Sequence, residues 1–139
     1  MKKRNLYLHI GTEKTGTTSI QECLFINKKK LSDFGHHFLQ SMGERNNRRL
    51  VCYSMNKKKD EFFNLTLSKF DTIEELKENI QNKLESELEQ IDESIANVII
   101  SSEHFHSRIC NSEEINDLKN LLDKYFHKIT IICYLREQA

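Results

Sequence analysis

Proline is absent from the 139-residue chain, and only four glycines are present. Because no proline-rich or glycine-rich linker marks a domain boundary, we expect residues 1–139 to form a single domain. No apolar run approaches the roughly 18 residues that a membrane span requires. The short apolar segment at residues 5–10 precedes a glycine-containing turn rather than a cleavage site, so we expect no signal peptide.

A surplus of charge is also missing, since Lys+Arg and Asp+Glu each total 21. Proteins dedicated to nucleic acids or membrane surfaces usually carry a basic surplus, so neither partner is expected. Cys23, Cys52, Cys110 and Cys133 show no CxxC spacing. We therefore expect reduced, mostly buried thiols in a cytoplasmic protein.

Apolar strands alternate with amphipathic helices along the chain. Thr72 and Glu75 form a capping-box pattern, and apolar residues then recur at three- and four-residue steps to Ile95. Strands are predicted at residues 5–10, 97–102 and 129–135, and helices from residue 17, over 73–95 and over 112–126. Continuous apolar strands separated by helices indicate an α/β fold with a parallel sheet covered on both faces. The segment at residues 36–70 shows no clear pattern overall; within it we expect a helix over residues 48–55 and an exposed loop over residues 56–60.

A polar loop joins the first predicted strand to the first helix, and residues 11–18 read GTEKTGTT. The two glycines can adopt backbone angles that bend a loop round an anion. Lys14 can stabilise charge on a bridging oxygen, and the hydroxyls of Thr17 and Thr18 can donate to phosphate oxygens. Backbone N–H groups and a helix amino end converge in such a loop, so it predicts a phosphate site.

The loop differs from a Walker A motif in the position of its lysine. A Walker A loop places lysine directly after the second glycine, where this chain has Thr17. A nucleotide triphosphatase also needs an acidic residue at a strand end to hold Mg²⁺. Residues 98–102 and 131–135 contain no Asp or Glu, although Glu103 follows the first segment. A P-loop kinase or nucleotide triphosphatase is therefore the alternative interpretation.

The run Lys14-Thr15-Gly16-Thr17-Thr18 resembles the donor loop of sulfotransferases that use 3′-phosphoadenosine-5′-phosphosulfate. In that family the lysine lies inside the strand–loop–helix turn. The resemblance implies a P-loop NTPase-like three-layer sandwich with a central parallel sheet, an adenine nucleotide donor as co-substrate, and no metal. The donor-binding residues that it implies are Thr12, Lys14, Thr15, Gly16, Thr17, Thr18 and Arg136.

Two further segments match the family. Tyr134-Leu135-Arg136 ends the last predicted strand, where the family places an arginine on the 3′-phosphate of the donor. After the middle strand, glycan-acting members use a glutamate, and cytosolic small-molecule members a histidine, as base on the acceptor hydroxyl. Glu103 and His104 occupy this position, so with Lys14 they are the predicted catalytic residues, and Glu103 is the preferred base. His104 and His106 lack evident further ligands for a metal site.

The function implied by the resemblance is sulfuryl transfer to a hydroxyl or amine of a carbohydrate or small-molecule acceptor. Family domains continue past the strand that carries the 3′-phosphate arginine. We therefore expect this chain to be the N-terminal part of such a domain, truncated at its C-terminus. A non-catalytic nucleotide-binding fragment of the same fold is a further alternative, and neither the acceptor nor the oligomeric state follows from the sequence.

Overall fold

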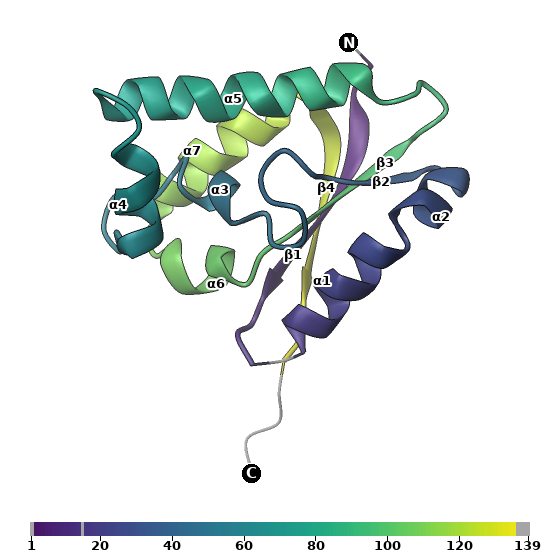
Figure 1. The fold of residues 1–139 in the computed structure, drawn as a ribbon, viewed down its shortest axis with the longest axis horizontal. Coiled ribbons are helices and arrows are strands. Elements are labelled where there is room, and N and C mark those ends of the chain that lie inside the picture. Colours follow the sequence, from purple (N-terminus) through teal and green to yellow (C-terminus); the bar gives the residue numbers. More distant parts are fainter. Residues whose placement is uncertain (1, 15, 136–139) are drawn as a thin grey trace.

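A parallel sheet forms the centre of the molecule (Figure 1), as the sequence predicts. The computed structural model describes residues 2–14 and 16–135, so the predicted donor residues Thr15 and Arg136 lie outside the described residues. Within the described ranges the sheet has four strands, in the order β2 (His36–Phe38), β3 (Asn97–Ser101), β1 (Arg4–Gly11) and β4 (Phe126–Cys133). All neighbouring strands pair in parallel, which confirms the α/β class.

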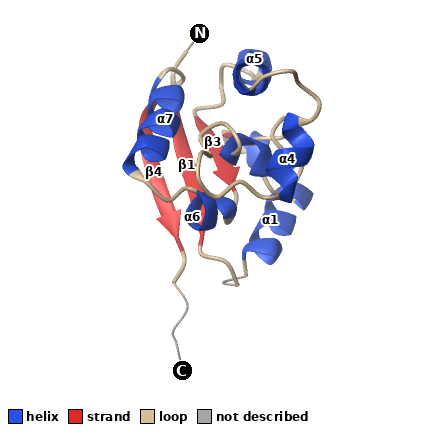
Figure 2. Ribbon diagram, turned by 90° about the vertical axis from the view of Figure 1, so that its left-hand side faces the viewer, coloured by secondary structure: helices blue, strands red, loops and turns tan. Residues whose placement is uncertain are grey.

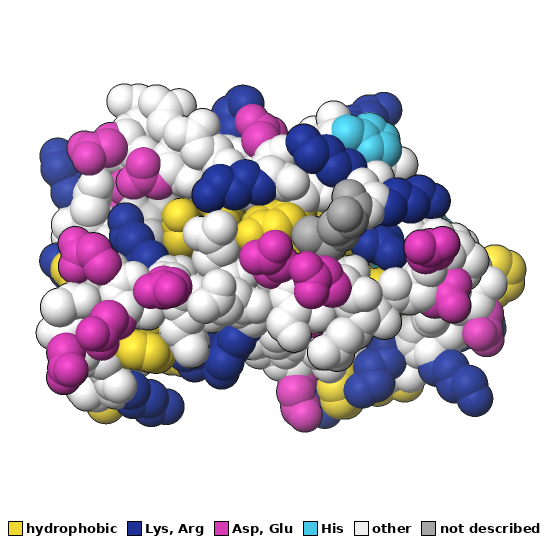
Figure 3. Space-filling model, turned by 90° about the horizontal axis from the view of Figure 1, so that it is seen from above, with side chains coloured by type: hydrophobic (Ala, Val, Ile, Leu, Met, Phe, Trp, Pro, Cys, Tyr) yellow, Lys and Arg dark blue, Asp and Glu magenta, His cyan; other side chains and the backbone are white. Residues whose placement is uncertain are grey.

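Helices cover both faces of the sheet (Figure 2). Side chains alternate along β1, so Tyr7 and His9 face α1, whereas Leu8 faces α7. One face carries α1 (Thr17–Ile26) and α2 (Lys28–Asp33); the other carries α5 (Ile73–Gln90) and α7 (Ser112–Asp123), with α3 (Arg48–Val51), α4 (Glu61–Leu67) and α6 (His104–Arg108). Acidic and basic side chains are interspersed on the surface that includes α5 (Figure 3).

The predicted long amphipathic helix is α5. Its buried residues Leu76, Ile80, Leu84 and Leu88 recur at four-residue steps and join the main hydrophobic core, while Thr72 caps its amino end. The helix ends at Gln90 rather than near residue 95. The side chain of Arg4 binds four carbonyl groups at this end, a long-range contact that the local pattern could not reveal.

Other differences from the sequence predictions arise where a short apolar segment suits either a helix or a strand. The last helix was predicted through residue 126, but α7 ends at Asp123 and Phe126 begins β4, where it pairs with Arg4. The short strand β2 and the helix α4, which is capped by Asp60, lie in the segment for which no pattern was evident.

The prediction of mostly buried thiols is wrong. All four cysteines are free, but only Cys52 is buried, and Cys23, Cys110 and Cys133 are exposed. Cys133 lies on β4 at one end of the strand order, where alternate residues face outward, and Ile131 on the same strand is 54% exposed. No helix in the described part of the chain is long and apolar enough to cross a membrane.

Candidate functional site

The loop that joins β1 to α1 lies against the residue that follows β3. Gly11 and Gly16 have φ angles of 124° and 83°, in the region that favours glycine. A Cβ atom at Gly11 would lie 3.3 Å from Cα of Glu103, so glycine allows the two strand ends to approach closely. On the other side, the backbone N–H of Thr12 donates to the carbonyl oxygen of Tyr134 at 3.1 Å, which fixes the loop to β4.

The amino end of α1 differs from those of α4, α5 and α7. Those helices are capped by side-chain oxygens of Asp60, Thr72 and Asn111, and each has an acidic residue in its first turn. Helix α1 follows Gly16, which has no side chain, and its first turn holds no acidic residue. Because the first N–H groups of a helix lack partners within the helix, this end can bind an anion such as phosphate.

The predicted donor-binding residues within the described ranges gather at this end of the sheet. Lys14, Gly16 and Thr18 are exposed, Thr12 is partly exposed, and Thr17 is 5% exposed. Lys14 has a φ angle of 62°, a left-handed conformation that few non-glycine residues adopt. The structure therefore places Lys14 and the hydroxyl-bearing residues Thr12, Thr17 and Thr18 between the carboxyl end of β1 and the first turn of α1.

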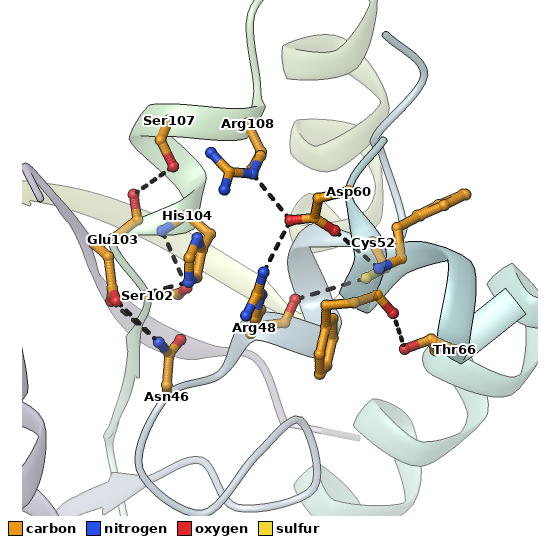
Figure 4. A network of polar contacts seen from close by, with 12 residues as sticks. Asn46, Arg48, Cys52, Asp60, Thr66, Ser102, Glu103, His104, Ser107 and Arg108 are labelled. Carbon is orange, nitrogen blue, oxygen red and sulfur yellow. Dashed lines mark hydrogen bonds and ion pairs between the residues drawn. The ribbon is translucent and has the colours of Figure 1, made fainter. Parts of the chain in front are cut away.

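The carboxylate of Glu103 is held by two amide side chains. Gln21 Nε2 donates to Oε2 at 3.0 Å, and Asn46 Nδ2 lies 3.2 Å from Oε1 and 3.1 Å from Oε2. Figure 4 shows Asn46 and His104 reaching Glu103 from different elements. The side chain of Glu103 is 17% exposed, so it is held firmly yet still accessible to a bound substrate.

His104 is a neutral neighbour of Glu103. Its Nε2 atom lies 3.6 Å from Oε1 of Glu103, and its buried Nδ1 atom has no hydrogen-bond partner among the described residues. Burial lowers the pKa of His104, and the guanidinium groups of Arg48 and Arg108 add to this effect, whereas Glu103 and Glu13 oppose it. The imidazole is therefore uncharged near pH 7 and able to accept a proton.

A second set of hydrogen bonds connects α1 to β3 and β1. Gln21 Nε2 also donates to Ser101 Oγ at 3.2 Å, and Ser101 Oγ lies 2.7 Å from Nδ1 of His9. Since Ser101 Oγ accepts from the amide, its own hydrogen can point to Nδ1. Burial lowers the pKa of His9, against the opposing charge of Glu103, and either neutral form of the ring can pair with the Ser101 hydroxyl through Nδ1.

Asn46 reaches Glu103 because the loop before α3 is fastened to β3. Oδ1 of the buried Asn47 accepts the backbone N–H of Ser101 at 2.8 Å, and its Nδ2 donates to the carbonyl oxygen of Gly43 at 3.0 Å. Gly43 has a φ angle of 130°, and a Cβ atom there would collide with the carbonyl oxygen of Asn46. Glycine at this position therefore shapes the turn that presents Asn46.

A cluster of two arginines and one aspartate adjoins His104. Arg48 Nη2 and Arg108 Nε each donate to Oδ2 of Asp60 at 2.9 Å, and the backbone N–H of Phe63 donates to Oδ1 at 2.8 Å (Figure 4). Burial alone would raise the pKa of Asp60, but these donors and positive charges lower it to about 2. The cluster holds two guanidinium groups close to His104.

Gln21 and Asn46 were not predicted from the sequence as site residues. Gln21 lies four residues after Thr17, so both residues share one face of α1, and both are buried. A polar residue at this spacing from the loop was the available signal. Asn46 lies in the segment without a pattern, and only the tertiary structure brings it to Glu103.

Residues 2–14 and 16–135 contain no group of three or more His, Cys, Asp or Glu side chains that could hold a metal ion. Comparison of the chain with protein-family models, with curated proteins and with solved structures finds no match.

Proposed function

We propose that the chain carries the donor loop and base of a sulfotransferase. The enzyme would move a sulfuryl group from 3′-phosphoadenosine-5′-phosphosulfate to a hydroxyl or amine of a carbohydrate or small-molecule acceptor. One observation carries the proposal: a phosphate-type loop with Lys14 inside it lies against Glu103, whose carboxylate two amides hold. A donor group and an acceptor group can meet at this point.

The donor side of the proposal uses the amino end of α1. The N–H groups and hydroxyls of Thr17 and Thr18 would bind the 5′-phosphate of the donor. Lys14 would lie near the oxygen that bridges phosphorus and sulfur, where negative charge develops as the bond breaks. By the resemblance, Arg136 would bind the 3′-phosphate, since a guanidinium group can bind phosphate through two parallel hydrogen bonds.

The acceptor side uses Glu103 as base. The acceptor oxygen attacks sulfur in line with the bridging oxygen, and its proton passes to the Glu103 carboxylate. The bond between sulfur and the bridging oxygen breaks, and adenosine 3′,5′-bisphosphate leaves with the bonding electrons. Lys14 stabilises that leaving group, so the loop and the base act on opposite sides of the transferred group.

His104 is the second candidate for the base. Its ring is uncharged near pH 7 because burial lowers its pKa, and it lies beside Glu103. The carboxylate of Glu103 ranks first because it follows β3 directly and contacts the loop at Gly11.

A kinase or nucleotide triphosphatase is favoured by one observation, the position of Glu103 after a strand next to the loop strand. Such enzymes use an acidic residue there to hold Mg²⁺. In this chain Gln21 and Asn46 already donate to the carboxylate, and the lysine precedes Gly16. Phosphoryl transfer therefore ranks second.

A labelling experiment separates the two functions. The active protein that contains this chain is incubated with donor carrying radiolabelled sulfate and a panel of glycans, phenols and amines, without Mg²⁺, and in parallel with ATP and Mg²⁺. The proposal predicts labelled acceptor and no ATP turnover. Mg²⁺-dependent ATP turnover without sulfate transfer would assign the site to phosphoryl chemistry. In the same assay Lys14→Ala is expected to slow sulfate transfer. Lys30→Ala on α2, away from the loop, is its control.

A further inference from the structure

Gln21 lies between the donor loop and the base. Its side chain is 4% exposed, and its Nε2 atom donates to Ser101 Oγ at 3.2 Å and to Glu103 Oε2 at 3.0 Å. An amide nitrogen carries two hydrogens, so both are used by these two acceptors. The contact joins α1 to the end of β3 through a buried side chain.

The direction of these hydrogen bonds is fixed by their partners. The carboxylate of Glu103 can only accept hydrogen bonds, so the group of Gln21 that faces Glu103 and Ser101 must be the donor end of the amide. Reversing the amide would place its oxygen against the carboxylate. The orientation of Gln21 therefore follows from the chemistry of the contacts.

Helix geometry relates this contact to the loop. Gln21 follows Thr17 by four residues, about one helical turn or roughly 6 Å along the axis. A donor phosphate bound at the amino end of α1 would thus lie one turn from the residue that holds Glu103. Ser101 pairs with His9 of β1, so the same contact also spans the two central strands.

We infer that Gln21 is a positioning residue that fixes the Glu103 carboxylate relative to the amino end of α1, so that donor binding is transmitted to the acceptor base. This inference rests on the proposed function. Asn46, in the loop before α3, donates to the same carboxylate. Between them, the two amides determine where the carboxylate points.

The side-chain amide of Asn46 provides an independent reporter, because no hydrogen bond joins it to Gln21 in the described structure whereas it contacts both oxygens of Glu103. In ¹H–¹⁵N spectra, the Asn46 NH₂ signals are assigned by their loss in Asn46→Ala and the Gln21 signals by their loss in Gln21→Met. Gln21→Met keeps the length of the side chain and removes both hydrogen bonds. Gln90→Met on α5 is the matched control, since Gln90 is exposed and remote from Glu103.

Gln21→Met is expected to shift the Asn46 NH₂ signals, because Glu103 loses one of its two holders, while Gln90→Met leaves them in place. Gln21→Asn, which retains an amide but is one methylene shorter, is expected to give the same shift and serves if the methionine variant fails to fold. Unchanged Asn46 signals in a folded Gln21 variant would overturn the inference.

Adenosine 3′,5′-bisphosphate then tests transmission from the loop. In the unaltered chain its addition is expected to shift the backbone N–H signals of Thr17 and Thr18 and the NH₂ signals of Gln21 and Asn46. In Gln21→Met the loop signals should still shift, but the Asn46 signals should not. Asn46 shifts of equal size in both proteins would refute transmission through Gln21. Absence of any shift at the loop would instead contradict the proposed function, and the comparison of variants without nucleotide would still decide whether Gln21 holds Glu103.

Discussion

The two ends of the central sheet both bury polar side chains, but they differ in how completely the buried polar atoms are hydrogen-bonded. At the amino end of β1, the guanidinium group of Arg4 is 4% exposed and donates four hydrogen bonds. Its acceptors are the carbonyl oxygens of Leu88, Ile91, Asp92 and Ile95, at 3.2, 3.2, 3.2 and 2.7 Å. These carbonyls lie at and just after the end of α5, where a cation is also favoured by the helix dipole.

At the carboxyl ends of β1 and β3, the polar network is incompletely paired. His9 Nε2, Asn46 Oδ1 and His104 Nδ1 are buried without a hydrogen-bond partner among the described residues. Native proteins pair most buried polar atoms, so unpaired ones call for an explanation. The contrast agrees with the proposed function, in which the Arg4 end contributes mainly to stability and the polar atoms at the Glu103 end contact a substrate.

Substitution of Glu103 is the most severe test of this difference between the two ends of the sheet. Glu103→Gln should lower sulfuryl transfer by roughly 100- to 10,000-fold, the range for loss of a general base, because an amide cannot take the acceptor proton. Binding of adenosine 3′,5′-bisphosphate should persist, since the base acts on the acceptor. Transfer rates and calorimetry measure the two effects. If His104→Ala is the damaging change and Glu103→Gln is mild, the base is His104.

Arg4→Met tests the opposite end and should act on folding. Removing the guanidinium group leaves carbonyl oxygens buried without donors, and we expect the free energy of unfolding to fall by about 3 kcal/mol. Urea denaturation gives the value, and Lys3→Met, whose exposed side chain makes one surface contact, is the control. A loss below about 1 kcal/mol would show that the two ends do not divide stability and function as described.

Unlike Arg4→Met, Lys14→Ala should affect the rate of transfer much more than the free energy of unfolding. The exposed Lys14 fills no core space, so the free energy of unfolding should change by less than about 0.5 kcal/mol. Loss of its charge near the leaving group should slow transfer roughly a hundredfold. Near-normal transfer in a variant of normal stability would remove Lys14 from the mechanism.

The smallest expected effect concerns pH. Burial lowers the pKa of His9 and His104 below the ordinary 6.5, so between pH 7 and 5 the unfolded chain binds more protons than the folded one. The free energy of unfolding should therefore fall as pH falls through this window.

Urea denaturation at pH 7 and pH 5 measures this pH effect. His9→Gln and His104→Gln should each flatten the dependence, whereas His127→Gln, at an exposed position on β4, should leave it unchanged. A pH effect of the same size in all three variants would place its origin outside the site.

The two ends also differ in how far the sequence could predict them. The loop between β1 and α1 was predictable because its signals are local: a strand, two glycines, a lysine and a helix follow one another within residues 5–26. The parallel sheet followed from the continuous apolar character of its strands. The position of Glu103 just after a strand was predictable for the same reason, whereas its role as the base stays a prediction.

Contacts between distant segments were not predictable. Arg4, near the amino terminus, donates to the carbonyl oxygen of Ile95 just after the end of α5. Asn46 likewise donates to Glu103, which lies 57 positions later in the sequence. The strand β2 has three residues, too few to show a period. In each case the determining interaction comes from tertiary structure, which local propensity does not encode.

Nucleotide binding tests the central claim most directly. Isothermal calorimetry would compare adenosine 3′,5′-bisphosphate, AMP and ATP, each with and without Mg²⁺. The account predicts that adenosine 3′,5′-bisphosphate binds most tightly, that Mg²⁺ is not required, and that Lys14→Ala weakens the binding. Equal or tighter binding of ATP, or a strict requirement for Mg²⁺, would contradict the assignment of this loop to a sulfuryl donor.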